Sequence, residues 1–162
     1  MGVAGSGKTT LGTALARELR WDFFDADDFH SAENIAKMTA AIPLSDTDRT
    51  PWLVALHNQL LSVLQAGRHP ILACSALKEK YRAQLLEGID DVAILYLKGS
   101  YDLLRSRLSA RRGHYMKPEM LQSQFDALEE PKNALILDVV MPLQEKLDTI
   151  FATYALKRSA NQ

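Results

Sequence analysis

Short apolar runs alternate along the chain with longer stretches in which apolar residues recur every three or four positions. The short runs predict β-strands, because a strand that is buried on both faces is apolar at nearly every residue. They lie at Trp21–Phe24, Ile71–Cys74, Ala93–Leu97 and Leu135–Val140. Such strands alternating with helices are typical of an α/β fold, in which helices cover both faces of a parallel sheet.

The longer stretches predict helices. Leu11, Leu15 and Leu19 form the first apolar stripe. Thr50 and Pro51 resemble an N-cap followed by proline at the first helical position, and Gly67 closes that helix. Further helices are expected near Glu79–Leu86, from Ser100 to about Ala110, from Pro118 and from Pro142. In such folds ligands bind at the carboxyl ends of the strands, and the polar motifs of this chain fall there.

Composition narrows the class of protein. A chain of 162 residues that is 47% hydrophobic suits one domain with its own core, here residues 1–162. A net charge of −1 argues against nucleic acid and against a membrane as partner, and no apolar run approaches the roughly 18 residues of a membrane span. The single cysteine, Cys74, excludes an intrachain disulfide, and we expect it to pack in a strand. Without a signal-peptide pattern, a cytoplasmic location is expected.

The chain opens on a phosphate-binding sequence. Gly2 and Gly7 bracket four residues and are followed by Lys8 and Thr9, which is the G-x-x-x-x-G-K-[ST] pattern of a P-loop. Glycines let the backbone N–H groups approach phosphates closely, and the following helix adds its positive end. In this pattern lysine reaches the β- and γ-phosphates and threonine ligates Mg²⁺. The expected nucleotide-binding residues here are Gly2, Gly5, Ser6, Gly7, Lys8, Thr9 and Thr10. A dinucleotide-binding pattern fails, because Thr10 stands where its third glycine belongs.

Three aspartates, Asp25, Asp27 and Asp28, follow the first strand. Carboxylates this close repel one another, so the cluster is expected to face Mg²⁺ or arginines. In an extended chain Asp25 and Asp27 point the same way. We expect Asp27 to contact the acceptor hydroxyl as its base or orienter, and Asp25 to hold a Mg²⁺-bound water. A solvated acidic turn is the alternative, and His30 is open between a substrate contact and an ordinary loop histidine.

Three further residues are candidates for binding an anionic substrate that carries hydroxyls. Arg49 lies in a polar, turn-rich stretch, and arginine is a fork-shaped donor for carboxylates. Ser75 follows the second strand, and Arg82 lies one helical turn beyond Lys78 on the same helix face. The alternatives are a local helix cap with its ion pair at residues 46–49 and a basic helix face in solvent.

Four arginines lie between residues 105 and 112. Arg107 and Arg111 are four positions apart and therefore share a helix face. Arginines supplied by a lid stabilise the charge of a phosphoryl group in transfer. We therefore expect both residues to serve the nucleotide, Arg111 to be catalytic, and a small lid to lie near residues 111–128. A nucleic-acid patch is the alternative, but no aromatic residues are interleaved in the arginine run.

Together these motifs resemble the gluconokinase family of P-loop carbohydrate kinases. The resemblance is carried, in chain order, by Gly2–Thr9, Asp25–His30, Lys37–Met38, Pro43–Leu53, Cys74–Lys78 with Tyr81–Arg82, Arg111–Tyr115, Ser123–Phe125 and Leu128–Pro131. The Cys-Ser-Ala-Leu-Lys and Asp-Arg-x-Pro-Trp-Leu strings are far more specific than the P-loop alone.

The resemblance implies a three-layer P-loop kinase fold, similar to that of nucleoside monophosphate kinases. It implies transfer of phosphate from ATP, with Mg²⁺, to the 6-hydroxyl of D-gluconate, and often a homodimer. Carried over by position, the residues that would line the sugar-acid pocket are Asp27, Arg49, Ser75 and Arg82. A shikimate-type kinase and a non-catalytic nucleotide-binding module are the alternatives.

Two departures from the family are visible in the sequence. The family has an apolar strand before the P-loop, whereas only Met1 precedes Gly2 here. We therefore expect a sheet that lacks this strand, and a natural start further upstream. The segment after Pro131 is also shorter than in the family, close to where the nucleotide base would sit.

Overall fold

The computed structural model describes residues 1–110 and 120–158. These residues contain four strands, β1 (Asp22–Asp25), β2 (Pro70–Ala73), β3 (Leu95–Lys98) and β4 (Leu135–Asp138). β1 pairs with β2, and β3 pairs with β4, in both cases in parallel. The predicted strands and their parallel direction are therefore confirmed, although individual ends differ by one or two residues.

The register brings the carboxyl ends of β1 and β2 together. Asp22 lies opposite Pro70, and Asp25 lies opposite Ala73. The aspartate cluster after β1 and the segment that contains Ser75 after β2 therefore leave the same edge of the sheet.

Helices lie before, between and after the four strands. They are α1 (Lys8–Leu19), the 3₁₀-helix η1 (Ala26–Phe29), α2 (Ala32–Thr39), α3 (Asp46–Gln65), α4 (Glu79–Leu85), α5 (Tyr101–Ala110), α6 (Leu121–Asp126) and α7 (Leu143–Thr153). The apolar stripes predicted all of these except η1 and α2. Pro142 is the N-cap of α7, as expected, whereas Pro118 lies outside the described residues.

The start of α3 differs from the prediction. The N-cap is Ser45, not Thr50, because Ser45 and Asp48 form a capping box. Asp48 N donates to Ser45 Oγ over 3.2 Å, and Ser45 N donates to Asp48 Oδ2 over 2.9 Å. This box satisfies two backbone donors at once. Pro51 therefore lies inside the helix, beyond the first turn that the sequence pattern assigned to it.

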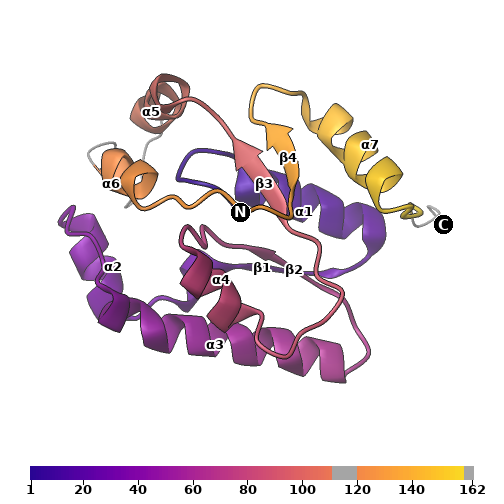
Figure 1. Cartoon of the computed structure of the whole chain (residues 1–162), viewed down its shortest axis with the longest axis horizontal. Coiled ribbons are helices and arrows are strands. Elements are labelled where there is room, and N and C mark those ends of the chain that lie inside the picture. Colours follow the sequence, from indigo (N-terminus) through magenta and orange to yellow (C-terminus); the bar gives the residue numbers. More distant parts are fainter. Residues whose placement is uncertain (111–119, 159–162) are drawn as a thin grey trace.

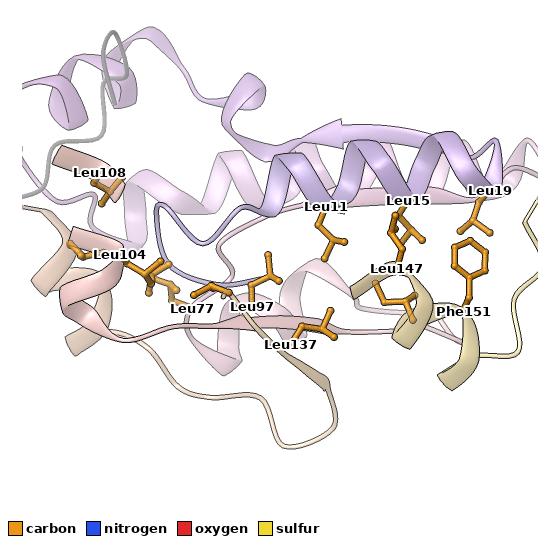
Figure 2. Close-up of a cluster of buried hydrophobic side chains, with 14 residues drawn as sticks. Leu11, Leu15, Leu19, Leu77, Leu97, Leu104, Leu108, Leu137, Leu147 and Phe151 are labelled. Carbon is orange, nitrogen blue, oxygen red and sulfur yellow. The ribbon is translucent and has the colours of Figure 1, made fainter. Parts of the chain in front are cut away.

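The helices lie on both sides of the strands (Figure 1). α3 contacts β2 and α4, whereas α1 contacts β1, β2 and α7. Figure 2 shows Leu11, Leu15 and Leu19 of α1 pointing toward Leu147 and Phe151 of α7. A second buried cluster lies between α3, α4 and the end of β2, and includes Trp52, Leu53, Leu56, Leu60, Cys74, Tyr81 and Leu85.

Within the described ranges, no helix combines the length and the apolar character that crossing a membrane requires.

Candidate active site

The P-loop has the backbone that its glycines predict. Gly2, Gly5 and Gly7 have φ angles of 143°, 79° and 93°, in the region that favours glycine. A Cβ atom at Gly2 would lie 2.7 Å from the carbonyl oxygen of Leu97, so a side chain there would push the loop away from β3. In the part of the chain described, no side chain caps the N-terminus of α1. Its first N–H groups therefore remain available to an anion.

Lys8 and Ser6 face the space that this loop encloses. Lys8 Nζ donates to the carbonyl oxygen of Val3 over 3.2 Å, which holds the cation across the loop. Ser6 Oγ is buried and has no hydrogen-bond partner among the described residues. A buried hydroxyl without a partner costs free energy. Both side chains are compatible with a polyphosphate as the ligand of this loop.

Thr9 and Asp25 bring a hydroxyl and a carboxylate together beside the P-loop. Thr9 Oγ1 donates to Asp25 Oδ2 over 2.6 Å. Hydroxyl and carboxylate oxygens suit Mg²⁺, which takes one or two protein ligands and completes its shell with phosphate oxygens and waters. Over residues 1–110 and 120–158, no three His, Cys, Asp or Glu side chains gather to hold a metal by themselves. The pair therefore fits Mg²⁺ better than a metal held by protein alone.

The aspartate cluster does not continue as an extended chain. Asp25 ends β1, and its Oδ1 accepts a hydrogen bond of 3.1 Å from Asp27 N, which caps η1. The prediction that Asp25 and Asp27 point the same way on one strand is therefore wrong, because the chain turns between them. Asp27 remains exposed. Trp52 Nε1 of α3 donates to the carbonyl oxygen of Ala26 over 2.7 Å and anchors this turn.

His30 connects the aspartate turn to α3. Its ring stacks on Trp52, with centroids 4.5 Å apart and planes inclined by 10°. Burial, the largest influence, lowers the pKa of His30 from its usual 6.5, while Asp27 raises it and Arg49 lowers it further. Nδ1 is buried without a hydrogen-bond partner among the described residues. The structure therefore places the predicted substrate residues Asp27, His30 and Arg49 close enough for their charges to act on one another.

Arg49 lies on the first turn of α3. Its Nη1 donates to the carbonyl oxygen of Leu44, and its guanidinium lies 5.5 Å from the centroid of the Tyr81 ring on α4. Hydrogen bonds from Lys80, and then from Tyr81, lower the pKa of the neighbouring Asp46 to about 2. These contacts fix the start of α3 against the start of α4.

Asp48 also has a structural partner. A hydrogen bond from Lys37 of α2, 2.6 Å long, and then bonds from Ser45 lower the pKa of Asp48 to about 2. Of the two interpretations that the sequence left open for residues 46–49, the helix cap with its ion pairs therefore describes both aspartates.

Arg82 and Ser75 lie where β2 leads into α4. Arg82 is buried, and its Nη1 donates to the carbonyl oxygens of Ala76 and Leu77 over 2.9 and 3.0 Å. It also pairs with Glu79. These bonds support the segment that carries Ser75, so a contact between Arg82 and substrate stays a prediction. The carbonyl oxygen of Ser75 accepts from Gly2 N over 3.5 Å, which places this segment beside the P-loop.

Of the two predicted nucleotide arginines, the structure describes Arg107, which lies in the last turn of α5. Arg107 Nη2 donates to the carbonyl oxygen of Val139, 3.2 Å away in the loop after β4. Lys146 of α7 is buried and donates to the same oxygen over 3.1 Å, and burial followed by the charge of Arg107 lowers the Lys146 pKa. Arg111, with the rest of residues 111–119 of the predicted lid, lies outside the described residues.

Sequence patterns missed three residues that hold this site together. Gln124 Oε1 of α6 accepts from the P-loop amide of Ala4 over 2.7 Å. Glu129 Oε2 accepts from Glu79 N over 2.6 Å, at the start of α4. Lys146 is the third. Gln124 and Glu129 act on backbone groups far away in sequence, so no local spacing could reveal them, although both fall in strings that carry the family resemblance. Lys146 acts on carbonyl oxygens of the loop directly before α7, and apolar spacing does not register such bonds.

Comparison with known proteins agrees with this geometry. A family model described as an AAA domain matches residues 1–131. A probable gluconokinase of Mus musculus is 48% identical over 148 residues, which is 81% of this chain and 80% of that protein. The thermoresistant gluconokinase of Escherichia coli is 41% identical over 148 residues, 89% of this chain and 85% of that protein.

This chain belongs to the gluconokinase family. The crystal structure of a gluconokinase from Sinorhizobium meliloti superposes with a TM-score of 0.82 at 40% identity, and covers 96% of this chain and 89% of that one. Membership in this family means that the described residues have the α/β P-loop kinase fold. It also identifies the protein as a phosphotransferase that uses ATP.

Proposed function

We propose that this chain transfers the γ-phosphoryl group of ATP to the 6-hydroxyl of D-gluconate, giving 6-phospho-D-gluconate and ADP. The observation that carries the proposal is the hydrogen bond between Thr9 and Asp25. It joins the P-loop, where the nucleotide would bind, to the turn that presents Asp27. The names of the relatives, gluconokinases at 41% and 48% identity, support gluconate as the acceptor.

Each residue then has a defined task. Amides of the P-loop and the start of α1 bind the phosphates, and Lys8 neutralises charge on them. Thr9 and Asp25 would hold Mg²⁺, which neutralises charge on the β- and γ-phosphates when it is bound. Asp27 orients the acceptor hydroxyl for in-line attack. His30 accepts from a gluconate hydroxyl, while Arg49 and Ser75 bind the carboxylate and hydroxyls.

The remaining predictions belong to the same proposal. The whole chain, residues 1–162, acts as one kinase domain with a lid near residues 111–128, and Arg111 contributes from this lid to catalysis. We also propose a homodimer, which light scattering would test. The one cysteine, Cys74, is a buried free thiol whose pKa burial raises to about 11, and an unreactive reduced thiol suits the cytoplasm.

The decisive experiment measures ADP release with ATP, Mg²⁺ and gluconate, shikimate, glycerate, AMP or no acceptor. We expect turnover with gluconate alone. Turnover with shikimate instead would assign the chain to a shikimate-type kinase. ATP binding without turnover on any acceptor would support the non-catalytic module.

Two substitutions test the assigned chemistry. Lys8→Ala removes the phosphate-neutralising cation, and Asp27→Asn removes the carboxylate that orients the hydroxyl. Each should lower kcat by about 10²-fold or more, because electrostatic and positioning terms of this kind are worth several kcal/mol. Asp28→Asn is the matched control, since Asp28 is equally exposed on the same turn. Near-normal turnover of Asp27→Asn would remove Asp27 from the mechanism.

A further inference from the structure

The chain between β2 and α4 has a backbone conformation that needs support. We call residues 75–78 the Ser75 segment. Within it Ala76 is buried and has a φ angle of 42°, in the left-handed region that residues other than glycine rarely adopt. Such a conformation persists only where the surrounding structure holds it. The carbonyl oxygen of Ser75 accepts from Gly2 N of the P-loop, so the shape of this segment decides where Ser75 lies relative to the nucleotide site.

Two side chains hold the Ser75 segment from different elements. Arg82 of α4 donates to the carbonyl oxygens of Ala76 and Leu77 over 2.9 and 3.0 Å. Glu129 follows α6 and makes two further bonds. Its N–H donates to the carbonyl oxygen of Leu77 over 2.9 Å, and its Oε2 accepts from Glu79 N over 2.6 Å. Figure 1 shows the chain after α6 passing between α4 and the β3–β4 pair, which is the path these bonds require.

The bond from Glu79 N makes Glu129 the cap of α4. The N-cap residue itself, Lys78, forms no side-chain bond to the first turn, and a lysine side chain has no hydrogen-bond acceptor. The carboxylate of Glu129 supplies that acceptor from a distant part of the chain. A carboxylate at a helix N-terminus accepts a charge-assisted bond and also complements the helix dipole. Loss of this side chain would release the first amide of α4 and the end of the Ser75 segment with it.

The same stretch of chain also holds the P-loop. Gln124 of α6 accepts from Ala4 N over 2.7 Å. The helix between the two contacts is anchored, because the ring of Phe125 packs edge-on against Tyr101 of α5, with centroids 5.5 Å apart and planes inclined by 68°. One anchored stretch therefore contacts the P-loop through Gln124 and the Ser75 segment through Glu129.

The next residue, Glu130, is bonded to another element. Its carboxylate accepts from Tyr96 Oη over 3.2 Å and from Lys98 Nζ over 2.9 Å, and both partners lie on β3. Glu129 and Glu130 are both exposed. Two adjacent residues of the same type thus support different elements, which provides a matched control.

We propose that Glu129 is a positioning residue for gluconate binding, which fixes the Ser75 segment relative to the P-loop. It acts through the backbone of Leu77 and Glu79. The proposal rests on the proposed function, in which Ser75 binds gluconate. It adds that one stretch of chain positions both substrate sites, the nucleotide side through Gln124 and the gluconate side through Glu129.

Steady-state kinetics of the full chain test this with three variants. Glu129→Ala removes the oxygen that accepts from Glu79 N, Glu129→Gln retains one such oxygen, and Glu130→Ala removes the neighbouring carboxylate. We expect Glu129→Ala to raise KM for gluconate by about 5-fold or more, as for the loss of a helix cap, because a displaced Ser75 binds gluconate less well. KM for ATP should change by less than about 2-fold, since Gln124 still holds the P-loop.

Glu129→Gln should return KM for gluconate to within about 2-fold of its original value, because the amide oxygen still accepts the bond. Glu130→Ala should leave this KM unchanged even where Tm falls. A role in stability alone predicts instead that Tm and kinetics decline together in both alanine variants. An unchanged KM for gluconate in Glu129→Ala would overturn the proposal, as would an equal rise in Glu130→Ala.

A second measurement does not depend on gluconate. Glu129→Ala should speed amide hydrogen exchange at Gly2, which donates to Ser75, by about 5-fold relative to Leu11, which donates to Gly7 at the start of α1. Glu130→Ala should show no such difference between the two amides. If the unaltered chain does not turn over gluconate, the proposed function fails and amide exchange alone decides. Unchanged exchange at Gly2 in Glu129→Ala would then overturn the positioning role.

Discussion

At the scale of single residues, the pair formed by Thr9 and Asp25 carries the largest consequence. Thr9 comes from the first turn of α1 and Asp25 from the end of β1, so two elements must be in place before both oxygens can face one ion. Asp25 is also fixed by the bond from Asp27 N to its other oxygen. A carboxylate oriented in this way loses little entropy when a cation binds.

Asp25→Asn should therefore weaken the response to Mg²⁺ more than the fold. The amide keeps the size of the side chain but loses its charge, so the Mg²⁺ concentration for half-maximal ADP release should rise by about 10-fold or more. Asp22→Asn on the same strand is the control, because Asp22 pairs with Arg68 and not with Thr9. An unchanged Mg²⁺ dependence in Asp25→Asn would contradict the assignment.

At the scale of elements, α6 and the P-loop act on each other through one side chain. Gln124 Oε1 accepts from Ala4 N over 2.7 Å and so holds a loop amide that no helix or strand satisfies. α6 lies within the range predicted as the lid, residues 111–128, so this bond links that range to the shape of the phosphate-binding loop.

Gln124→Ala should raise KM for ATP and lower kcat/KM by about 10-fold, since a lost hydrogen bond that leaves a backbone donor unpaired costs 1–3 kcal/mol. Gln124→Glu retains the acceptor oxygen and should recover most of the loss. Gln122→Ala is the control on the same helix, because Gln122 donates to Asp126 of that helix and not to the P-loop among the described residues. Equal kinetics for Gln124→Ala and Gln122→Ala would show that the bond does not position the P-loop.

The elements also show what a sequence can predict. Strands and most helices follow from local apolar spacing, and the P-loop follows from a fixed pattern. η1 and the true start of α3 depend on hydrogen bonds from Asp25 and from Ser45 with Asp48, which apolar spacing does not register. The position of Arg82 on α4 is visible in sequence, and its contact with substrate stays a prediction. Its bonds to the carbonyl oxygens of Ala76 and Leu77 are not visible there.

At the scale of the whole molecule, the amine of Met1 and the partly buried His30 make stability depend on pH in the same direction. Burial lowers the pKa of the Met1 amine from 8.0 to about 5 and that of His30 below 6.5. Over these ranges the unfolded chain binds more protons than the folded one, so the free energy of unfolding rises with pH. The pKa values of Asp46 and Asp48 are lowered from 3.8 to about 2, so these two carboxyl groups change the free energy of unfolding only when the pH falls below 3.8.

The 162-residue chain should therefore lose stability steadily as the pH falls from 8 toward 5, by at most about 4 kcal/mol from the Met1 amine. Urea unfolding at pH 8, 6.5 and 5 measures this, with intact mass confirming that Met1 is retained. The charges of Lys8 and Arg82 lie near the amine and lower its pKa further. Acetylation of the amine removes its proton uptake, so the acetylated chain should keep only the smaller slope of His30 below pH 6.5. Identical slopes with and without acetylation would show that the amine is solvated, and that it does not donate to the carbonyl oxygen of Leu95 in β3.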